Sequence, residues 1–199
     1  MSQVWWYSRA VSSPAVHQIC EVGFNAGHSS VTALMSNPTA KVLSFDWMRM
    51  SYSSKSFDFV QLAWPARHEL VVGDSTVSIP NFINDLRERG EQFTCDVIFI
   101  DGGHTYEIAK SDLEHMFHLS HPATLLVIDD VFCESEFCEG PTAAWQEFVD
   151  SGAVRQTGCQ RGDVERNWCY GYYDHAGTRK KEDGTENLEA SGGWGSIWA

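Results

Sequence analysis

The sequence predicts an α/β fold in which helices cover both faces of a mostly parallel sheet, the doubly wound arrangement. Strand-like and helix-like segments alternate five times along the chain, which is the pattern of such folds. Two of the strand-like runs, 95–101 and 123–130, are apolar on both faces, as expected for central parallel strands. A loop with two glycines joins the first strand to the first helix. Together these observations predict the fold class.

The individual elements follow from hydrophobic periodicity and from residues that start or stop helices. Strands are expected at 17–22, 40–46, 68–75, 95–101 and 123–130. Helices are expected at 29–37, about 57–64, 77–89, 106–119 and 141–152. Gly90 and Gly152 stop two of these helices, and Pro141 lies in the first turn of the last one. Two further runs, 153–160 and 167–174, predict an antiparallel hairpin at the edge of the sheet.

Length and composition predict one domain. The chain has 199 residues, of which 43% are hydrophobic, and this is enough for a single buried core. We expect the domain to span 1–175, and we expect 176–199, which is charged and glycine-rich, to be a disordered tail. The start lacks the pattern of a secretion signal, and no run of about 18 apolar residues is present. A soluble, cytoplasmic protein without a membrane partner is therefore expected.

Charge and cysteine usage narrow the class of partner. The formal net charge of −13 argues against nucleic acid, whose phosphates require a basic surface, and favours a small cationic ligand or a metal ion. The six cysteines contain no CxxC pair, and Cys20 and Cys95 lie in apolar strand runs where a reduced, buried thiol is typical. We therefore expect no disulfide framework; a bond between Cys133 and Cys138 across a loop is the alternative.

Acidic residues follow the two most apolar strands. Asp101 closes the run CDVIFID, and Asp129 and Asp130 close ATLLVIDD. Residues at the carboxyl ends of parallel strands project into the crevice where open α/β sheets bind ligands. Two such edges side by side could hold a divalent cation. The alternatives are that these acids cap helices, form salt bridges across the sheet edge or make a simple turn.

The glycine loop lies where a nucleotide-type ligand would bind. Glu21-x-Gly23-x-x-x-Gly27 stands at the first strand-to-helix turn, but it matches neither the dinucleotide fingerprint nor the phosphate loop. By itself it is equally consistent with a tight corner. Asp46 ends the second strand, where a carboxylate can accept both hydroxyls of a ribose, and the alternative is a surface Asp.

Asp74 and Ser75 end the third strand, where they would lie near an adenine and could accept from its exocyclic amine. Four of the five predicted strand ends therefore carry an acid, which is hard to explain as chance.

These residues together resemble class I S-adenosylmethionine (SAM)-dependent methyltransferases. The resemblance runs from about Ile19 to Asp174, through EVGFNAGHS, VLSFD, VVGDS, FIDGGHTYE, LLVIDDV and GPTAAW. Within that superfamily, the segment FIDGGHTYEIAKSDLEH followed by LLVIDDV looks most like the small-molecule O-methyltransferases, metal-dependent enzymes related to catechol O-methyltransferase and macrolide sugar O-methyltransferases. The resemblance implies a Rossmann-like methyltransferase sheet, SAM as cofactor and a small-molecule hydroxyl as methyl acceptor.

The resemblance also implies roles for single residues. The implied cofactor-binding residues are Glu21, Gly23, Phe24, Asn25, Gly27, Ser29, Asp46, Asp74, Ser75 and Asp101. Asp101, Asp129 and Asp130 match the positions that hold Mg²⁺ or another divalent cation. His104 occupies the place of the base in the catechol enzyme, three residues beyond the first metal ligand, so His104 with Asp101 forms the expected catalytic pair. The alternative for His104 is a loop histidine bonded to the backbone.

Several alternatives remain open at this point. Metal-dependent relatives usually carry helices before the first strand, and none is predicted here; the acceptor site could instead use the loop 47–64 or a second subunit of a homo-oligomer. Trp5 and Trp6 could cover the mouth of the site or be exposed. The rival functions are a nicotinamide-dependent oxidoreductase on the same fold and a SAM-binding module without catalysis.

Overall fold

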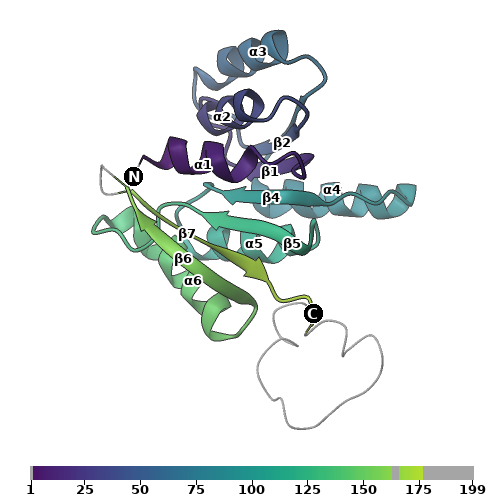
Figure 1. Ribbon diagram of the computed structural model, residues 1–199. Helices are drawn as coiled ribbons and strands as arrows, with labels where there is room; N and C mark the ends of the chain where they lie inside the picture. The colour runs from purple at the N-terminus through teal and green to yellow at the C-terminus, as the bar shows by residue number, and fades with distance from the viewer. Residues whose placement is uncertain (1, 163–165, 177–199) are drawn as a thin grey trace.

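The computed structural model describes residues 2–162 and 166–176, and these residues form a seven-stranded sheet with helices on both faces (Figure 1). The strands are β1 (Gln18–Val22), β2 (Lys41–Asp46), β3 (His68–Val72), β4 (Cys95–Ile100), β5 (Ser120–Ile128), β6 (Val154–Arg161) and β7 (Asn167–Tyr173). Their order in the sheet is β3-β2-β1-β4-β5-β7-β6. The first five strands are parallel, and β7 is antiparallel to both β5 and β6. The predicted doubly wound sheet with an antiparallel edge is confirmed.

The strand register aligns the carboxyl ends of the central strands. Val22 of β1 lies opposite Phe45 of β2 and Ile100 of β4, and Ile100 lies opposite Ile128 of β5. The residue that follows each of these four strand positions therefore reaches the same edge of the sheet. This register determines which polar side chains can meet.

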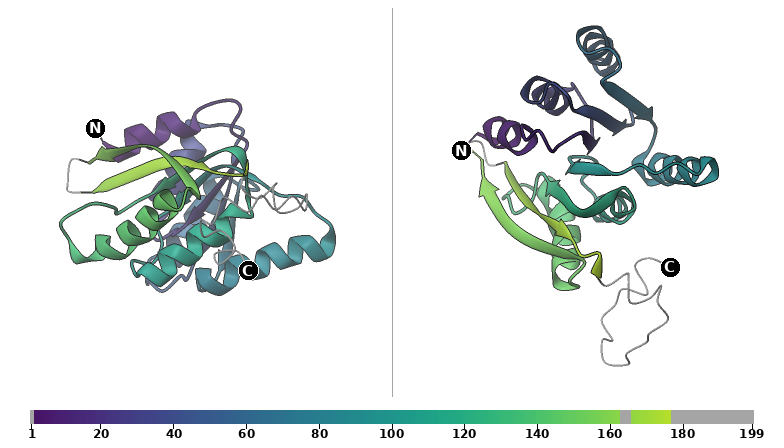
Figure 2. Two further views of the ribbon diagram at one scale, coloured as in Figure 1. Left: turned by 90° about the horizontal axis from the view of Figure 1, so that it is seen from below. Right: turned by 45° about the vertical axis from the view of Figure 1, so that its right-hand side comes forward.

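Two apolar clusters, one on each face, hold the helices against the sheet. The helices are α1 (Gln3–Val11), α2 (His28–Ser36), α3 (Ser53–Ala63), α4 (Ser75–Arg89), α5 (Tyr106–Phe117) and α6 (Glu139–Asp150), with a short 3₁₀ helix, η1 (Glu136–Cys138), before α6. Residues of α4, α5 and α6 pack against one face of the strands, and residues of α1, α2 and α3 pack against the other (Figure 2). Neighbouring strand residues alternate between the clusters: Ile19 joins one and Cys20 the other.

Helix α1 is the main element that the sequence analysis missed. Tyr7 and Val11, four positions apart, are buried against the sheet, which is the spacing of an amphipathic helix. Trp6 packs on Trp168 and Tyr170 of β7, with ring centroids 5.8 and 4.9 Å apart. Trp5, in contrast, is 51% exposed. One tryptophan therefore attaches α1 to the antiparallel edge, and the other faces solvent.

Other boundaries differ by a few residues. Helix α3 begins at Ser53 rather than near residue 57, and β3 ends at Val72 because Gly73 breaks it and Asp74 caps α4. Strand β5 begins at Ser120, earlier than predicted. The predicted tail lies outside the described residues except for residue 176. None of the described helices is long and apolar enough to cross a membrane.

The expectation of reduced cysteines is wrong. All six cysteines are paired, as Cys20–Cys95, Cys133–Cys138 and Cys159–Cys169. The first pair joins β1 to β4, strands that are far apart in sequence but adjacent in the sheet, and the third joins register partners of β6 and β7. The Cys133–Cys138 bond is the alternative that the sequence offered. Composition and spacing could not predict the other two pairs, because those depend on which strands become neighbours.

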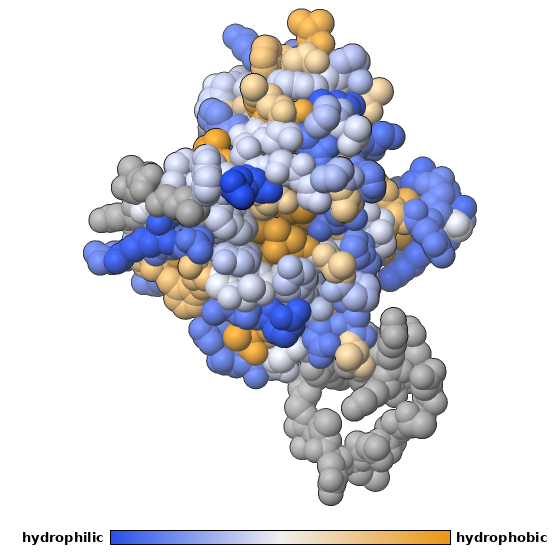
Figure 3. Space-filling view, viewed as in Figure 1, coloured by the Kyte–Doolittle hydropathy of each residue, from blue (hydrophilic) through white to orange (hydrophobic). Residues whose placement is uncertain are grey.

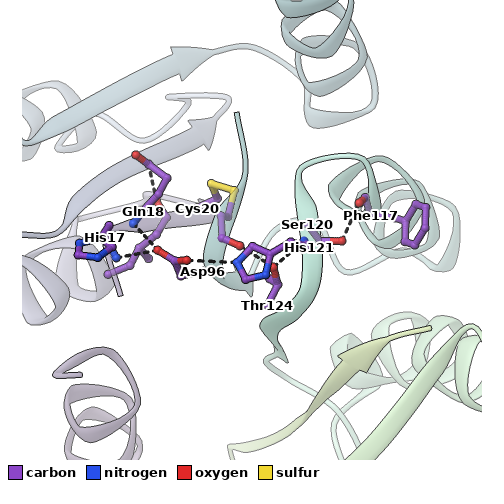
Figure 4. The surroundings of a disulfide bond; sticks show 10 residues. His17, Gln18, Cys20, Asp96, Phe117, Ser120, His121 and Thr124 are labelled. Atoms are coloured by element: carbon purple, nitrogen blue, oxygen red, sulfur yellow. Dashed lines mark hydrogen bonds and ion pairs between the residues drawn. A yellow bond between two sulfur atoms is a disulfide. The ribbon is translucent and has the colours of Figure 1, made fainter. Parts of the chain in front are cut away.

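The surroundings of the Cys20–Cys95 bond include a polar junction at the amino-terminal edge of the sheet (Figure 4). Asp96 accepts hydrogen bonds from the backbone N–H groups of His17 and Gln18 at 2.6 and 2.8 Å, and it pairs with the His121 ring at 3.1 Å. The junction therefore links the starts of β1, β4 and β5, at the edge opposite the strand-end acids.

The surface is mostly hydrophilic on the face shown in Figure 3. Exposed apolar side chains lie on α3, at the top of that view, where Phe59 is 58% and Leu62 is 83% exposed.

Candidate functional site

Two adjoining cavities open where the aligned strands end. The larger, of about 440 Å³, is lined by Asp46, Asp74, Ser75, Asp101, His104 and Asp130, among others. The smaller, of about 370 Å³, is lined by Gln3 and Tyr7 of α1 and by Phe24, Ser29 and Asp129. Gly23, Asn25, Asp101 and Arg166 line both cavities. The strand-end acids are therefore brought to one crevice.

The glycine loop approaches β4 so closely that it tolerates no side chain at its first glycine. A Cβ atom at Gly23 would lie 1.9 Å from the backbone oxygen of Asp101, and Gly23 has a φ of +98°. Gly27, with a φ of +77°, is the N-cap of α2. Both glycines are thus required by backbone geometry, and the loop leaves its open side to the cavities.

Asp46 is held in a fixed orientation on the wall of the larger cavity. Its carboxylate accepts hydrogen bonds from the backbone N–H of Asn25 at 2.8 Å and from the backbone N–H of Met48. Asn25 in turn accepts a hydrogen bond from the Tyr52 hydroxyl at 2.6 Å. Each carboxylate oxygen has two lone pairs, so both oxygens of Asp46 can accept a further hydrogen bond from a ligand.

Asp74 and Ser75 also line the larger cavity, and Asp74 has a structural role besides. Its side chain caps α4, accepting from the backbone N–H of Thr76 at 3.0 Å and from the Thr76 hydroxyl at 2.7 Å. Trp47 and Met50, from the loop offered as an acceptor site, line the same cavity.

The structure places Glu21 away from the cavities, although the resemblance implies that it lines the cofactor site. Its side chain is fully buried beneath α2 and lines neither cavity. It accepts hydrogen bonds from the hydroxyls of Ser30 and of Ser44, the latter at 2.6 Å, and His68 lies beside both serines. Burial raises the pKa of Glu21. Its position, fixing α2 to β1 and β2, makes it a support of the glycine loop.

Asp101, His104 and Asp130 form a compact cluster that could hold a metal ion. One ligand atom from each lies within 4.8 Å of the others. His104 Nε2 lies 3.0 Å from Asp130 Oδ2, and Arg166 Nη1 lies 3.6 Å from Asp130 Oδ1. Asp130 has a φ of +54°, an uncommon backbone conformation for a residue with a side chain.

The carboxylates influence one another. Burial, and then the neighbouring charges of Asp129 and Asp130, raise the pKa of Asp101 well above its usual range. Burial also raises the pKa of Asp129, although the Gln3 side chain opposes this. A cation bound between these buried acids would offset the repulsion among their negative charges and lower their pKa values.

Asp129 is not a member of this cluster, but it lines a small pocket together with Asp101, His104 and Asp130. Its Oδ1 accepts the backbone N–H of Asp130 at 2.9 Å, and its side chain lines the cavity beneath α1. The structure thus brings together Asp101, Asp130 and His104, and Asp129 lies beside them while its side chain also lines the cavity beneath α1.

Residues that the sequence analysis did not select also line the cavities: Gln3, Tyr7, Arg166 and Phe137. A 3,4-spaced apolar pattern over 4–11 could have indicated α1. No comparable signal indicates Arg166, which lies in a loop, or Phe137, which lies in the short helix η1.

The sequence matches one protein family. The family described as a methyltransferase domain matches residues 20–131, from β1 to just beyond β5. No curated protein matches the sequence.

Solved structures share the fold over most of their length. The O-methyltransferase TomG from Streptomyces achromogenes, involved in tomaymycin synthesis and solved with SAM, is 17% identical with a TM-score of 0.66, covering 86% of this chain and 79% of that one. An O-methyltransferase from Bacillus cereus, solved with SAH, is 16% identical with a TM-score of 0.66, and the match covers 86% of this chain and 80% of that one. The TDP-rhamnose 3'-O-methyltransferase CalS11, of calicheamicin biosynthesis, is 17% identical with a TM-score of 0.59, covering 83% and 77%. At these identities the likeness establishes the shared fold.

Proposed function

The chain belongs to the methyltransferase domain family, and from this premise we propose that it transfers a methyl group from SAM to a hydroxyl of a small molecule, with the assistance of Mg²⁺. The observation that carries the proposal is the meeting, at one sheet edge, of the glycine loop, Asp46 and the Asp101–His104–Asp130 cluster. O-methyltransferases of the same fold, including one of a nucleotide-linked sugar, support the choice of a hydroxyl acceptor.

The larger cavity suits the nucleoside part of SAM. Asp46 has free lone pairs for two ribose hydroxyls, and Asp74 and Ser75 stand one strand further along the edge, on the wall where the adenine would lie. Bound SAM supplies an electrophilic methyl group on a positively charged sulfur. Asp101 and the other carboxylates would stabilise that charge at the junction of the two cavities.

The acidic cluster fits a divalent cation such as Mg²⁺. Asp130 Oδ1 is buried and accepts no hydrogen bond from the residues that the structure describes; its one ion-pair partner among them is Arg166 Nη1, 3.6 Å away, so this oxygen could bind a metal. Mg²⁺ prefers oxygen ligands, so we assign Asp101 and Asp130, with Asp129 as the third carboxylate, to the metal and leave the His104 imidazole for proton transfer. A bound Mg²⁺ would lower the pKa of the acceptor hydroxyl.

His104 is the proposed general base. Its Nε2 faces Asp130 Oδ2, which orients the ring and stabilises the positive charge that the imidazole gains with a proton. The side chain of His104 is 43% exposed and lines the larger cavity, so an acceptor can reach it. A neutral imidazole nitrogen can accept the proton of a hydroxyl group, which is the role of a general base.

Cofactor identity is tested by calorimetry with SAM and with NAD. We expect SAM to bind and NAD not to bind. Asp46→Ala should weaken SAM binding about tenfold or more, because charged hydrogen bonds to the ribose are lost. Asp58→Ala, which removes an exposed acid of α3, is the control and should bind as the wild type does. Binding of NAD, or unchanged affinity of Asp46→Ala at intact circular dichroism, would contradict the proposal.

Catalysis is tested by methyl transfer to catechols, hydroxylated macrocycles and sugars, with and without Mg²⁺. We expect His104→Ala to lower kcat by roughly 10²–10⁴-fold at unchanged SAM affinity. Asp130→Ala should remove the dependence of the rate on Mg²⁺. A wild-type protein that binds SAM but methylates none of these acceptors would instead support the binding module without catalysis.

A further inference from the structure

The loop between β5 and α6 lies against the proposed base. Phe137 in this loop places its ring centroid 5.4 Å from that of His104, with the two planes at 79°, an edge-to-face contact. Phe137 is 41% exposed and lines the larger cavity together with His104 and Asp130. A large apolar side chain is therefore kept at the surface beside the acidic cluster.

The backbone after Phe137 is packed on the backbone of His104. A Cβ atom at Gly140 would lie 2.2 Å from the backbone oxygen of His104 and 2.6 Å from the backbone nitrogen of Tyr106. Only glycine permits this approach. The first turn of α6 and the segment that carries His104 are thus in direct contact.

The start of the loop is fixed as well. The backbone N–H of Phe132 donates to the Thr142 hydroxyl at 2.7 Å, and the backbone oxygen of Phe132 accepts from the Asn167 side chain at 2.7 Å. Between these anchored ends, the Cys133–Cys138 disulfide closes the loop across five positions. Because Phe137 directly precedes Cys138, the bond restricts the positions that its ring can adopt.

The His104 ring has few other restraints. Within the described chain, its recorded partners are the Asp130 carboxylate and the Phe137 ring. A half-exposed imidazole with one hydrogen bond can rotate away from its partner, and an edge-to-face contact with a neighbouring ring limits that rotation.

We propose that Phe137, held by the loop that Cys133–Cys138 closes, is a positioning residue that keeps His104 turned towards Asp130. This inference rests on the proposed function, in which His104 accepts the proton of the acceptor hydroxyl. The disulfide supports the site through this one aromatic contact, so the bond and the ring act as a unit.

The kinetic test compares variants of the intact chain under saturating Mg²⁺. Phe137→Ala, and the double variant Cys133→Ser with Cys138→Ser, should each lower kcat roughly ten- to hundredfold, with the affinity for SAM unchanged. Phe137→Tyr, which keeps the ring, should restore the rate. Phe132→Ala is the matched control, because it removes a phenyl ring of similar exposure, 44%, from the same loop, and it should leave kcat within about twofold of the wild type.

A mutant cycle tests whether ring and disulfide act together. Adding Phe137→Ala to the double cysteine variant should cause no further loss of kcat. If the two changes lower kcat independently, so that their effects multiply in the triple variant, the inference is wrong. It is also wrong if the wild type is active and Phe137→Ala leaves kcat unchanged. Either result leaves the proposed function intact.

A readout without catalysis separates the two proposals. The proton resonances of the His104 ring should shift in Phe137→Ala and in the double cysteine variant, and not in Phe132→Ala, because the neighbouring aromatic ring is lost or displaced. Unchanged resonances in these variants would refute the positioning role, whether or not any acceptor is methylated. If the resonances shift but the wild type proves inactive, the positioning role stands and the proposed function is refuted.

Discussion

Asp112 is an acid with no exposed surface, on the inner side of α5 beneath the loop that follows β4. A Cβ atom at Gly102 would lie 2.9 Å from Asp112 Oδ2, so the carboxyl group packs directly under the edge of the larger cavity. Burial raises the pKa of Asp112 to about 7, although the Ser75 side chain opposes the shift. At neutral pH this single residue therefore titrates inside the protein.

Asp112→Asn should make the protein more stable at alkaline pH. The folded pKa of about 7 lies above the unfolded value of about 3.9, so the stabilising contribution of the protonated group is complete below pH 4 and is lost as the pH rises through 7. An Asn side chain does not titrate, so the variant has no such dependence. We expect the free energy of unfolding of the variant, relative to that of the wild type, to be about 2–4 kcal/mol larger at pH 8 than at pH 4.

Thermal unfolding by calorimetry at the two pH values measures this difference. Asp85→Asn, an exposed acid of α4, is the control. If Asp112→Asn and the wild type differ equally at both pH values, Asp112 does not titrate as described.

The position of helix α1 depends on one residue at the C-terminal end of helix α2. The Asn37 side chain, buried at the C-cap of α2, donates to the backbone oxygens of Val11, Ser13 and Val16 at 2.9, 3.1 and 2.9 Å. Its Oδ1 accepts from the backbone N–H of Ala40 at 3.1 Å. The connection from α1 to β1 is thus fastened to α2 and β2, and with it the α1 wall of the smaller cavity.

Asn37→Ala should loosen α1. Several buried carbonyl groups would lose their donor, at a cost of about 2–4 kcal/mol in the free energy of unfolding. Hydrogen exchange should rise in α1 more than in α5, and urea unfolding gives the loss of stability. Asn84→Ala, on the outer part of α4, is the control and should have little effect. Unchanged exchange in α1 would show that its apolar contacts alone hold it.

The whole molecule combines a formal net charge of −13 with three disulfides. The bonds span 75, 5 and 10 residues and connect β1 to β4, the β5–α6 loop to itself, and β6 to β7. Disulfides persist in oxidising compartments, so this pairing opposes the cytoplasmic location that the sequence predicts. It also closes the segment between β5 and α6 that carries Phe137.

Chemical labelling should report all six cysteines as oxidised. Protein unfolded in guanidinium with an alkylating reagent and no reductant should keep its mass, and six labels should appear after reduction. Removing the Cys20–Cys95 bond by a double Ser substitution should cost about 4 kcal/mol, and removing Cys133–Cys138 about 2 kcal/mol, because the longer loop loses more entropy when it is closed. Labels without reduction would mean that the thiols are free, as the sequence analysis expects.

The sequence by itself determined the fold class, because buried parallel strands and their connecting helices have periodicities that any short window reveals. It also determined that Asp46, Asp101 and Asp130 meet at one edge, since the carboxyl ends of parallel strands share a side of the sheet. Only the tertiary structure decided the remainder: the burial of Glu21, the turning of Asp129 towards α1, the Cys20–Cys95 and Cys159–Cys169 pairs and the contact of Phe137 with His104. These depend on which segments become neighbours and on the direction of each side chain, and neither is encoded in local pattern.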